Sequence, residues 1–303
     1  MLLQHQKKSF IQEGTKMTDV SVVGLGDMGS ALAHTLLKNG YSVTVWNRSA
    51  DKADPLTSAG AVLAGSAEEA ISLSPVTITC ITSHDRTIQL IEDTNISLAG
   101  KTIIELSTGG ITEAETLSRM LSERGADWII GAITGYPSSV GGKDLVLISA
   151  CNQDVWERWE DLIKALGGSS VCVGDQAGMV PTLFAALFTT RQGFMFGMIY
   201  GGLVCKKAGI PLEEFARQVP ISMGVLPSYH QYFSDSVAGE IFESSEASMA
   251  TYAAALDDAL ATFEALGASS ELPKLFSDIA HKGMDAGLNE KALTAVIGLL
   301  GEN

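Results

Sequence analysis

The chain has 303 residues, of which 46% are hydrophobic and 18% charged, a composition typical of a compact globular protein with room for two domains. Its 20 basic and 35 acidic side chains give a net charge of −15, which argues against a nucleic acid or an anionic membrane as the main partner. The four cysteines stand far apart and show no metal-ligand spacing. We therefore expect free thiols in a reducing, cytoplasmic compartment and no metal site.

A glycine-rich turn follows the first predicted strand. The β-branched run 20–23 stops at GLGDMG, and leucines then recur at helical spacing before a second strand in YSVTVWN. In such a unit Gly24 permits the tight turn, Gly26 lets the backbone approach a pyrophosphate, and Gly29 lets the helix pack close to the strand. An ordinary glycine-rich turn is the alternative. The turn is predicted to bind a dinucleotide through Gly24, Leu25, Gly26, Asp27, Met28 and Gly29.

The end of the second strand selects the dinucleotide. A site that prefers NAD usually has Asp or Glu there, whose carboxylate would repel a 2′-phosphate. This chain has Asn47, Arg48 and Ser49, with Lys52 one turn later. Arg48 can meet a phosphate with a fork of donors, Ser49 can donate to it, and Lys52 adds positive charge. The sequence therefore predicts NADPH, the alternative being a solvated arginine on a loop.

Strands and helices alternate up to residue 173, and only helices are predicted beyond residue 178. After Lys52 the pattern predicts strands near 76–81, 101–106, 128–133, 145–150 and 171–173, and helices near 66–73, from 86 and over 112–124. Such alternation builds a parallel sheet covered by helices, which is an α/β Rossmann domain. The later helices are predicted near 184–205, 211–219, 226–233, 246–266, 273–286 and 290–300.

Three regions follow from this pattern. Residues 1–16 lack the continuous apolar core of a signal peptide, precede a methionine that could itself be a start, and are expected to form a loose extension. Residues 17–177 are expected to form the NADPH-binding Rossmann domain. Residues 178–303 are expected to form an all-α dimerisation and substrate domain, entered through a long interdomain helix.

The long apolar segment 184–205 is too interrupted to cross a membrane. Arg191 and Gln192 divide it, and its longest clean run is too short for a hydrocarbon core of about 30 Å. Glycines at 193, 197 and 201 stand four residues apart, so another helix can approach closely on that face. We expect a helix of a second subunit there, in a homodimer, with packing inside one chain as the alternative.

The arrangement of a nucleotide domain, a long helix and an all-helical domain resembles the β-hydroxyacid dehydrogenase superfamily, and within it the imine reductases and reductive aminases. The resemblance covers nearly the whole chain from Met17. It rests on GLGDMGSALA with VWNRS, on GAITGYPSSVG at 131–141, and on VGDQAGMVPTLFAALF at 173–188. It implies an NADPH-dependent oxidoreductase of C=N bonds, a domain-swapped homodimer and a small-molecule imine or iminium substrate.

The start of the long helix departs from the patterns of these relatives. Hydroxyacid dehydrogenases of the superfamily have a catalytic lysine there, but no lysine occurs between Met179 and Thr190, and Thr182 takes its place. Imine reductases commonly have Asp or Tyr on this helix, whereas this chain has Phe184, with Gln192 two turns later. An iminium ion already carries its charge, while a carbonyl needs a donor for the developing alkoxide. The sequence therefore favours C=N over C=O reduction.

The resemblance also selects further site residues. Tyr252, in a segment similar to the family's later helix, is the preferred proton donor, with a packing role as the alternative. Thr108, after the fourth of the strands, is expected near the nicotinamide and substrate, and Thr182 completes the catalytic candidates. The cofactor site is also assigned Ile81, Thr82, Ser83, Ser107 and Thr108. The substrate pocket is assigned Phe184, Phe188, Gln192, Met223, Tyr229 and Tyr252.

Three functions remain open from the sequence. The leading one is NADPH-dependent reduction of a cyclic, largely apolar imine or iminium to an amine, with or without reductive amination. The second is a β-hydroxyacid or aldehyde reductase with a non-standard proton donor. The third is a catalytically silent NADPH-binding protein.

Overall fold

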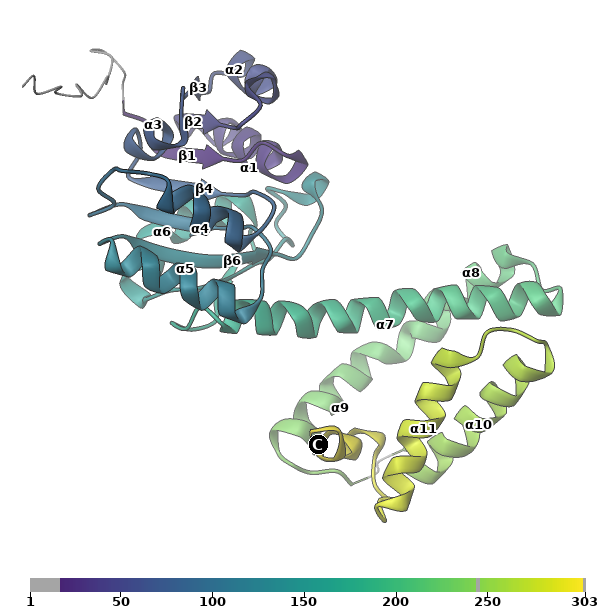
Figure 1. The fold of residues 1–303 in the computed structure, drawn as a ribbon. Helices are drawn as coiled ribbons and strands as arrows, with labels where there is room; N and C mark the ends of the chain where they lie inside the picture. The colour runs from purple at the N-terminus through teal and green to yellow at the C-terminus, as the bar shows by residue number, and fades with distance from the viewer. Residues whose placement is uncertain (1–16, 244–245, 302–303) are drawn as a thin grey trace, which may run out of the picture. The chain divides into compact units, whose positions relative to one another are not determined.

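The computed structural model describes residues 17–243 and 246–301 (Figure 1). The expectation of a loose extension at residues 1–16 lies outside the described residues. The chain divides into two compact units after Phe188. The first unit is α/β and the second is helical, so the predicted fold class is confirmed.

The first unit is built on an eight-stranded sheet with the order β3-β2-β1-β4-β5-β6-β7-β8. Its strands are β1 (Val20–Val23), β2 (Val43–Trp46), β3 (Val62–Leu63), β4 (Val76–Thr79), β5 (Thr102–Glu105), β6 (Asp127–Ile133), β7 (Leu147–Ala150) and β8 (Val171–Cys172). The order reverses between β1 and β4, and open α/β sheets bind ligands beyond the carboxyl ends of strands at such a point. The sheet thus places the glycine turn and the end of β4 at one site.

One pair of strands departs from the predicted parallel sheet. Strand β7 runs antiparallel to β6, while the other neighbouring pairs are parallel. The connection between these two strands contains only the short 3₁₀ helix η2 (Pro137–Ser139). A parallel return usually runs through a crossover α-helix. Residues 134–146 contain no α-helix, and the chain turns back to pair antiparallel with β6.

Helices cover both faces of the sheet (Figure 1). Helices α1 (Asp27–Lys38) and α6 (Gln153–Leu166) bury Leu32, Leu36 and Ile163 in the core of one face. Helices α4 (His84–Glu92) and α5 (Ile111–Glu123) bury Ile91 and Leu117 in the core of the other. The remaining helices of this unit are η1 (Ala50–Ala53), α2 (Asp54–Ser58) and α3 (Ala67–Ser72).

Helix α7 (Met179–Ala208) begins in the first unit and ends in the second, and it is longer at both ends than predicted. The other helices of the second unit are α8 (Leu212–Ser222), η3 (Met223–Val225), α9 (Leu226–Ala238), α10 (Met249–Ala265), α11 (Glu271–Asp285), η4 (Leu293–Val296) and α12 (Ile297–Leu300). The helix expected over 290–300 is therefore replaced by a 3₁₀ turn and one α-helical turn. In the described part of the chain, no helix has the length and apolarity needed to span a membrane.

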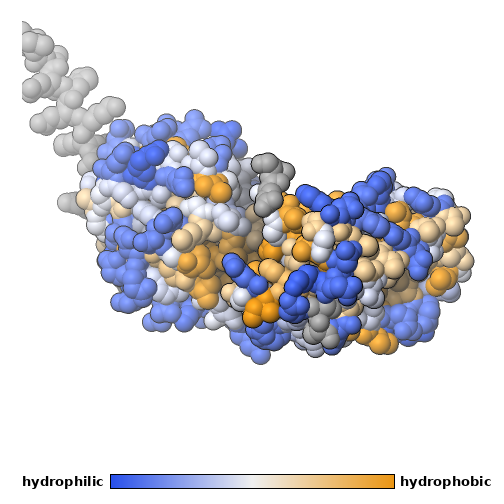
Figure 2. Space-filling view, turned by 90° about the horizontal axis from the view of Figure 1, so that it is seen from below, coloured by the Kyte–Doolittle hydropathy of each residue, from blue (hydrophilic) through white to orange (hydrophobic). Residues whose placement is uncertain are grey.

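The second unit has a small core and an apolar surface. Helices α10 and α11 pack around Met249, Ala253 and Ala280, which are its fully buried apolar cluster. Many large apolar side chains of this unit stay exposed, and orange areas are visible among the blue ones on its surface (Figure 2). These side chains include Phe194, Phe196, Ile199, Ile221 and Val225.

Candidate active site

The turn between β1 and α1 has the geometry of an anion-binding loop. Gly24 has a φ of +98°, and a Cβ atom there would lie 2.4 Å from the carbonyl oxygen of Cys80. A Cβ at Gly29 would lie 1.9 Å from the carbonyl oxygen of Gly24, so α1 can pack against the turn only with glycine at this position. A Cβ at Gly26 would meet nothing within 4 Å. Gly26 is the N-cap residue of α1 and has no side chain to accept from the first-turn N–H groups, so these groups remain available to an anion.

A cavity of about 940 Å³ lies over this turn. The backbone N–H of Leu25 donates to Asn47 Oδ1 at 3.0 Å, which ties the turn to the end of β2. Three cations, Arg48, Lys52 and Arg86, line the same cavity. The other predicted cofactor residues that line it are Gly24, Gly26, Asp27, Met28, Gly29, Asn47, Ser49, Ile81 and Thr82. The carboxylates of Asp27, Glu68 and Asp93 line the same cavity, so the three cations are local contacts for phosphate groups and not a net positive charge. The volume and the open face of the cavity fit a dinucleotide.

Arg86 was not singled out in the sequence. It lies in the first turn of α4, and its Nη1 donates to Gln89 Oε1 at 2.9 Å. The sequence feature that could have indicated Arg86 is a basic residue in the first turn of the helix that follows β4, the strand next to β1. That position lies at the switch point of the sheet, where a ligand of a doubly wound fold binds.

A second cavity of about 330 Å³ adjoins the first, and the two share Met28, Cys80 and Ile81 as lining residues. Its walls come from the ends of β4 and β5, from β6 and from the first turns of α7, all within the first unit. The lining residues beyond the shared three are His84, Leu106, Ser107, Thr108, Gly109, Gly131, Ala132, Ile133, Gly135, Val180, Pro181 and Phe184. A mostly apolar wall with a few polar groups suits a small organic substrate.

Several predicted residues lie at or beside the second cavity. Thr108 is exposed, and its Oγ1 donates to the carbonyl oxygen of Thr82 at 3.4 Å. Ser107 Oγ accepts a hydrogen bond from the N–H of Ile81 at 2.9 Å. Phe184 lines the cavity and stacks on Phe188, with ring centroids 5.8 Å apart.

Three other predicted residues have local structural contacts. Thr182 Oγ1 donates to the carbonyl oxygen of Gly178 at 2.8 Å, a bond within the first turns of α7. Ser83 caps α4 by accepting from the N–H of Arg86 at 3.4 Å. Leu25 is buried, and neither Leu25 nor Ser83 is among the lining residues of the two cavities.

The second unit contains the remaining predicted residues, namely Gln192, Met223, Tyr229 and Tyr252. Burial, and then the neighbouring Tyr252 and Tyr232, raise the pKa of Tyr229 above its usual value. The three tyrosines therefore form one cluster. Their assignment to substrate binding and catalysis stays a prediction.

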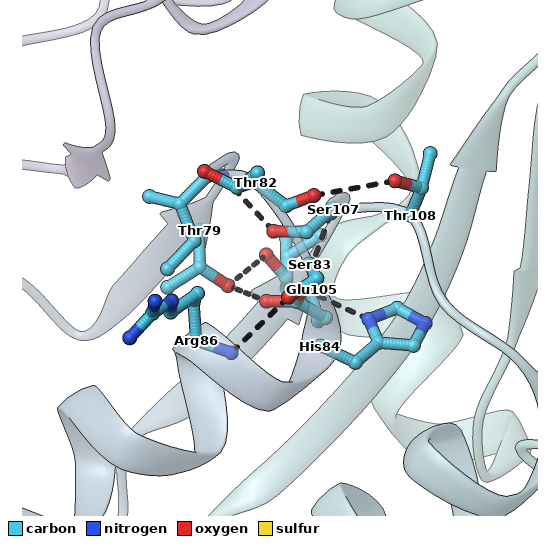
Figure 3. Close-up of polar contacts among 10 residues, drawn as sticks. Thr79, Thr82, Ser83, His84, Arg86, Glu105, Ser107 and Thr108 are labelled. Carbon is cyan, nitrogen blue, oxygen red and sulfur yellow. Dashed lines mark hydrogen bonds and ion pairs between the residues drawn. The ribbon is translucent and has the colours of Figure 1, made fainter.

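A buried carboxylate and a buried imidazole lie beside the second cavity, and the sequence analysis missed both (Figure 3). The Glu105 and His84 side chains are 0% and 3% exposed, and His84 Nδ1 lies 3.0 Å from Glu105 Oε1. The N–H of Ser107 also donates to Oε1, at 3.2 Å, and the hydroxyl of Thr79 donates to Oε2. Thr79 and Glu105 are cross-strand partners in β4 and β5, so the pairing of these strands builds the cluster.

Two family models together match most of the chain. Residues 19–174 match the NAD binding domain of 6-phosphogluconate dehydrogenase, and residues 178–302 match the C-terminal domain described as NADPH-dependent reductive aminase-like. The chain belongs to the imine reductase and reductive aminase family. The resemblance predicted from the sequence is confirmed, and so is the prediction of an NADPH-dependent oxidoreductase at the level of the family.

Individual members of the imine reductase and reductive aminase family show the same likeness. An NADPH-dependent reductive aminase of Aspergillus oryzae (strain ATCC 42149 / RIB 40) is 29% identical over 223 residues, which are 73% of this chain and 75% of that protein. A reductive aminase from Aspergillus terreus in complex with NADPH and ethyl levulinate has a TM-score of 0.87 at 27% identity, covering 94% of this chain and 100% of that one. An imine reductase from Pseudomonas sp. has a TM-score of 0.86 at the same identity and coverage.

Proposed function

We propose that the protein reduces the C=N bond of a cyclic, largely apolar imine or iminium to an amine, with NADPH as the cofactor. The observation that supports this most is the second cavity, a small apolar space that adjoins the dinucleotide cavity. Its walls hold few polar groups, and the first turns of α7 bring no ionisable side chain to it. Such a pocket suits a substrate whose charge is already present or needs only one proton.

The chain's own residues would hold the cofactor as follows. The N–H groups at the start of α1 would bind the pyrophosphate, and Arg48, Ser49 and Lys52 would bind the 2′-phosphate. Bound NADPH supplies a hydride to the carbon of the C=N bond. Ser107 and Thr108 line the second cavity and hydrogen-bond to Ile81 and Thr82, which line the first, so they would lie beside the nicotinamide and the substrate. Residues 17–177 are kept as the proposed NADPH-binding domain, and residues 178–303 as the dimerisation and substrate domain.

One contact weakens the carbonyl alternatives. A β-hydroxyacid or aldehyde reductase needs a donor for the developing alkoxide, and Thr182 stands where the superfamily has lysine. The Thr182 hydroxyl already donates to the carbonyl oxygen of Gly178 at 2.8 Å. Its proton is thus engaged within the helix, which favours C=N over C=O reduction.

Reductive amination belongs to the same proposal. The relative from Aspergillus oryzae is a reductive aminase, and the apolar cavity suits a ketone and an amine as well as the imine they form. The test is NADPH consumption with cyclohexanone and allylamine together, compared with each alone at neutral pH. Faster consumption with the pair supports amination, whereas equal rates limit the activity to preformed imines.

We also propose a homodimer that exchanges helices between subunits. The second unit has a small buried apolar cluster and leaves Phe196, Ile199 and Ile221 at 50%, 62% and 70% exposure. Surfaces of this kind usually mark an interface.

We also propose that the protein is cytoplasmic. The four cysteines are unpaired in the structure, as is usual in a reducing compartment.

The function is tested with a substrate panel. NADPH oxidation is followed with 1-pyrroline and 3,4-dihydroisoquinoline, and NADP⁺ reduction with small β-hydroxyacids. Turnover of the imines alone supports the proposal. Turnover of the hydroxyacids alone would replace it with the second function, and NADPH binding without any turnover would indicate the silent protein.

A further inference from the structure

The second cavity has one imidazole, that of His84, among its lining residues. Among its described lining residues, the ionisable side chains are the imidazole of His84 and the thiol of Cys80, and the other polar side chains are the hydroxyls of Ser107 and Thr108. Burial, and then the nearby Glu105 carboxylate, raise the pKa of the Cys80 thiol to about 12. Cys80 therefore stays a neutral thiol, and His84 is the group left to exchange a proton.

The position of His84 is fixed by contacts on several sides. Its backbone N–H donates to the carbonyl oxygen of Thr108 at 3.1 Å, and its Nδ1 lies 3.0 Å from Glu105 Oε1. A Cβ at Gly109 would lie 2.1 Å from the ring's Cδ2, so the ring packs directly against a glycine that leaves space for it. The ring is thus anchored to the segment that presents Ser107 and Thr108 to the cavity.

The carboxylate determines which ring nitrogen is available. Because Glu105 takes Nδ1, the second ring nitrogen, Nε2, is left to contact a ligand, and no hydrogen bond joins it to the described part of the chain. A carboxylate behind an imidazole fixes its tautomer and stabilises the imidazolium that forms during proton transfer. The Glu105 oxygens also accept from Thr79 and Ser107, so the carboxylate is held in place (Figure 3).

We infer that His84 is the proton donor for neutral imines, with Glu105 as its positioning residue. The assignment rests on the proposed C=N reduction. The proton leaves Nε2 and forms the N–H bond of the product amine, while the hydride from NADPH forms the C–H bond. The Nε2 lone pair then takes a proton from solvent after the amine leaves, which restores the donor.

The charges around His84 agree with this role. Glu105 faces it from β5, and Cys80, directly after β4, lines the same cavity. The lining residues from β6 and α7 are not ionisable, namely Gly131, Ala132, Ile133, Val180, Pro181 and Phe184. The exposed Asp85 and Arg86 follow it on its own helix. The protonated ring is therefore paired with one buried carboxylate and faces an otherwise uncharged cavity.

The test compares two substrates that differ in one proton. The neutral imine 3,4-dihydroisoquinoline needs a proton, whereas the N-methyl iminium of the same ring system needs none. In His84→Gln, kcat for the neutral imine should fall by about 10²-fold, the usual scale of general acid catalysis. For the iminium, kcat should change by less than about threefold, and the NADPH Kd and Tm should stay close to wild type. The matched control is His34→Gln, at an exposed histidine on α1, which should change neither rate.

A second readout does not depend on turnover. In protein with ¹⁵N-labelled histidine, the Nε2 resonance of His84, identified by its loss in His84→Gln, should shift when 1,2,3,4-tetrahydroisoquinoline is added. The His34 resonance should not shift. If the wild-type protein reduces no C=N substrate, the proposed function fails, and this resonance still reports whether His84 contacts an amine.

Four outcomes would overturn the assignment. Unchanged imine turnover in His84→Gln would exclude the residue as donor. An equal loss of imine and iminium turnover with a lowered Tm would give it a structural role only. An imine-specific loss in Tyr252→Phe, without one in His84→Gln, would make Tyr252 the donor instead. An unmoved Nε2 resonance at saturating amine would likewise contradict the contact.

Discussion

His84 and Phe184 line the same cavity from two different elements, the first turn of α4 and the first turns of α7. Phe184 stands where imine reductases commonly have Asp or Tyr, and it cannot donate a proton. The structure therefore places an imidazole on one wall of the second cavity and an apolar ring on another. A proton donor introduced at position 184 would therefore lie in the same cavity as His84.

A donor at position 184 should restore activity that is lost at position 84. In the double variant His84→Gln with Phe184→Tyr, kcat for 3,4-dihydroisoquinoline should rise about tenfold over His84→Gln alone, because the phenol would face the same cavity. The Tyr ring keeps the stacking on Phe188. Steady-state kinetics with the N-methyl iminium as control checks this. A double variant no faster than the single one would show that position 184 cannot deliver a proton.

Arg48 should set the preference for NADPH over NADH. Arg48→Ala should raise the NADPH Kd about tenfold or more, since hydrogen bonds to charged groups contribute about 1.5–3 kcal/mol. The NADH Kd should change little, because NADH lacks the 2′-phosphate. Fluorescence titration measures both values, and Arg119→Ala, at an exposed arginine on α5, is the matched control. An equal change for both cofactors would contradict the assignment.

Two glycines of the turn should respond differently to the same added methyl group. Gly29→Ala places a Cβ 1.9 Å from the carbonyl oxygen of Gly24 and should lower both Tm and NADPH affinity. Gly26→Ala meets nothing within 4 Å in the free protein, so Tm should stay near wild type while NADPH affinity falls. Calorimetry and NADPH titration separate the two effects. Full NADPH affinity in Gly26→Ala would mean that the pyrophosphate does not approach this residue.

The Cys80 thiol should be unreactive toward alkylating reagents at pH 8. The raised pKa of Cys80, about 12, leaves almost no thiolate at pH 8, because thiolate appears only as the pH rises toward the pKa. Cys80 should therefore stay unmodified by iodoacetamide at pH 8, as read by peptide mass spectrometry. Labelling should be measurable only near pH 11 and above, if the fold persists there. Rapid labelling at pH 8 would contradict the burial of Cys80 beside the Glu105 carboxylate.

The oligomeric state is open to direct measurement. A homodimer should give a mass of about 64 kDa by light scattering, twice that of the 31.9 kDa chain. Ile199→Glu should lower that mass, because it would place a charge on the exposed apolar face of α7. A wild-type monomer at micromolar concentration would contradict the proposed dimer.

The glycine turn was predictable because it lies in one contiguous segment, in which Gly24 and Gly29 each have a backbone reason to be glycine. Helix α6 was also predictable and was missed, since Val155, Trp156, Leu162 and Ile163 recur at helical spacing. The His84–Glu105 pair was not predictable in this way. The two residues stand 21 positions apart, and only the pairing of β4 with β5 and the entry into α4 bring them together.

Strand direction and the last helix show the limits of local patterns. A run such as 147–150 reads the same in a parallel and an antiparallel strand. The antiparallel direction of β7 goes with a connection from β6 that contains no crossover α-helix. The segment 290–300 has a helical composition, yet Ala295 donates back to Ala292 in a 3₁₀ turn. Its final α-helix is only one turn long.

The most direct test of C=N reduction by NADPH is a single incubation with 3,4-dihydroisoquinoline, an aldehyde competitor and NADPH deuterated at C4. If the protein reduces the C=N bond with NADPH, the amine carries one deuterium at the former C=N carbon, one NADPH is consumed per amine formed, and the aldehyde stays unchanged. Deuterium in an alcohol derived from the aldehyde, with the imine left intact, would contradict it.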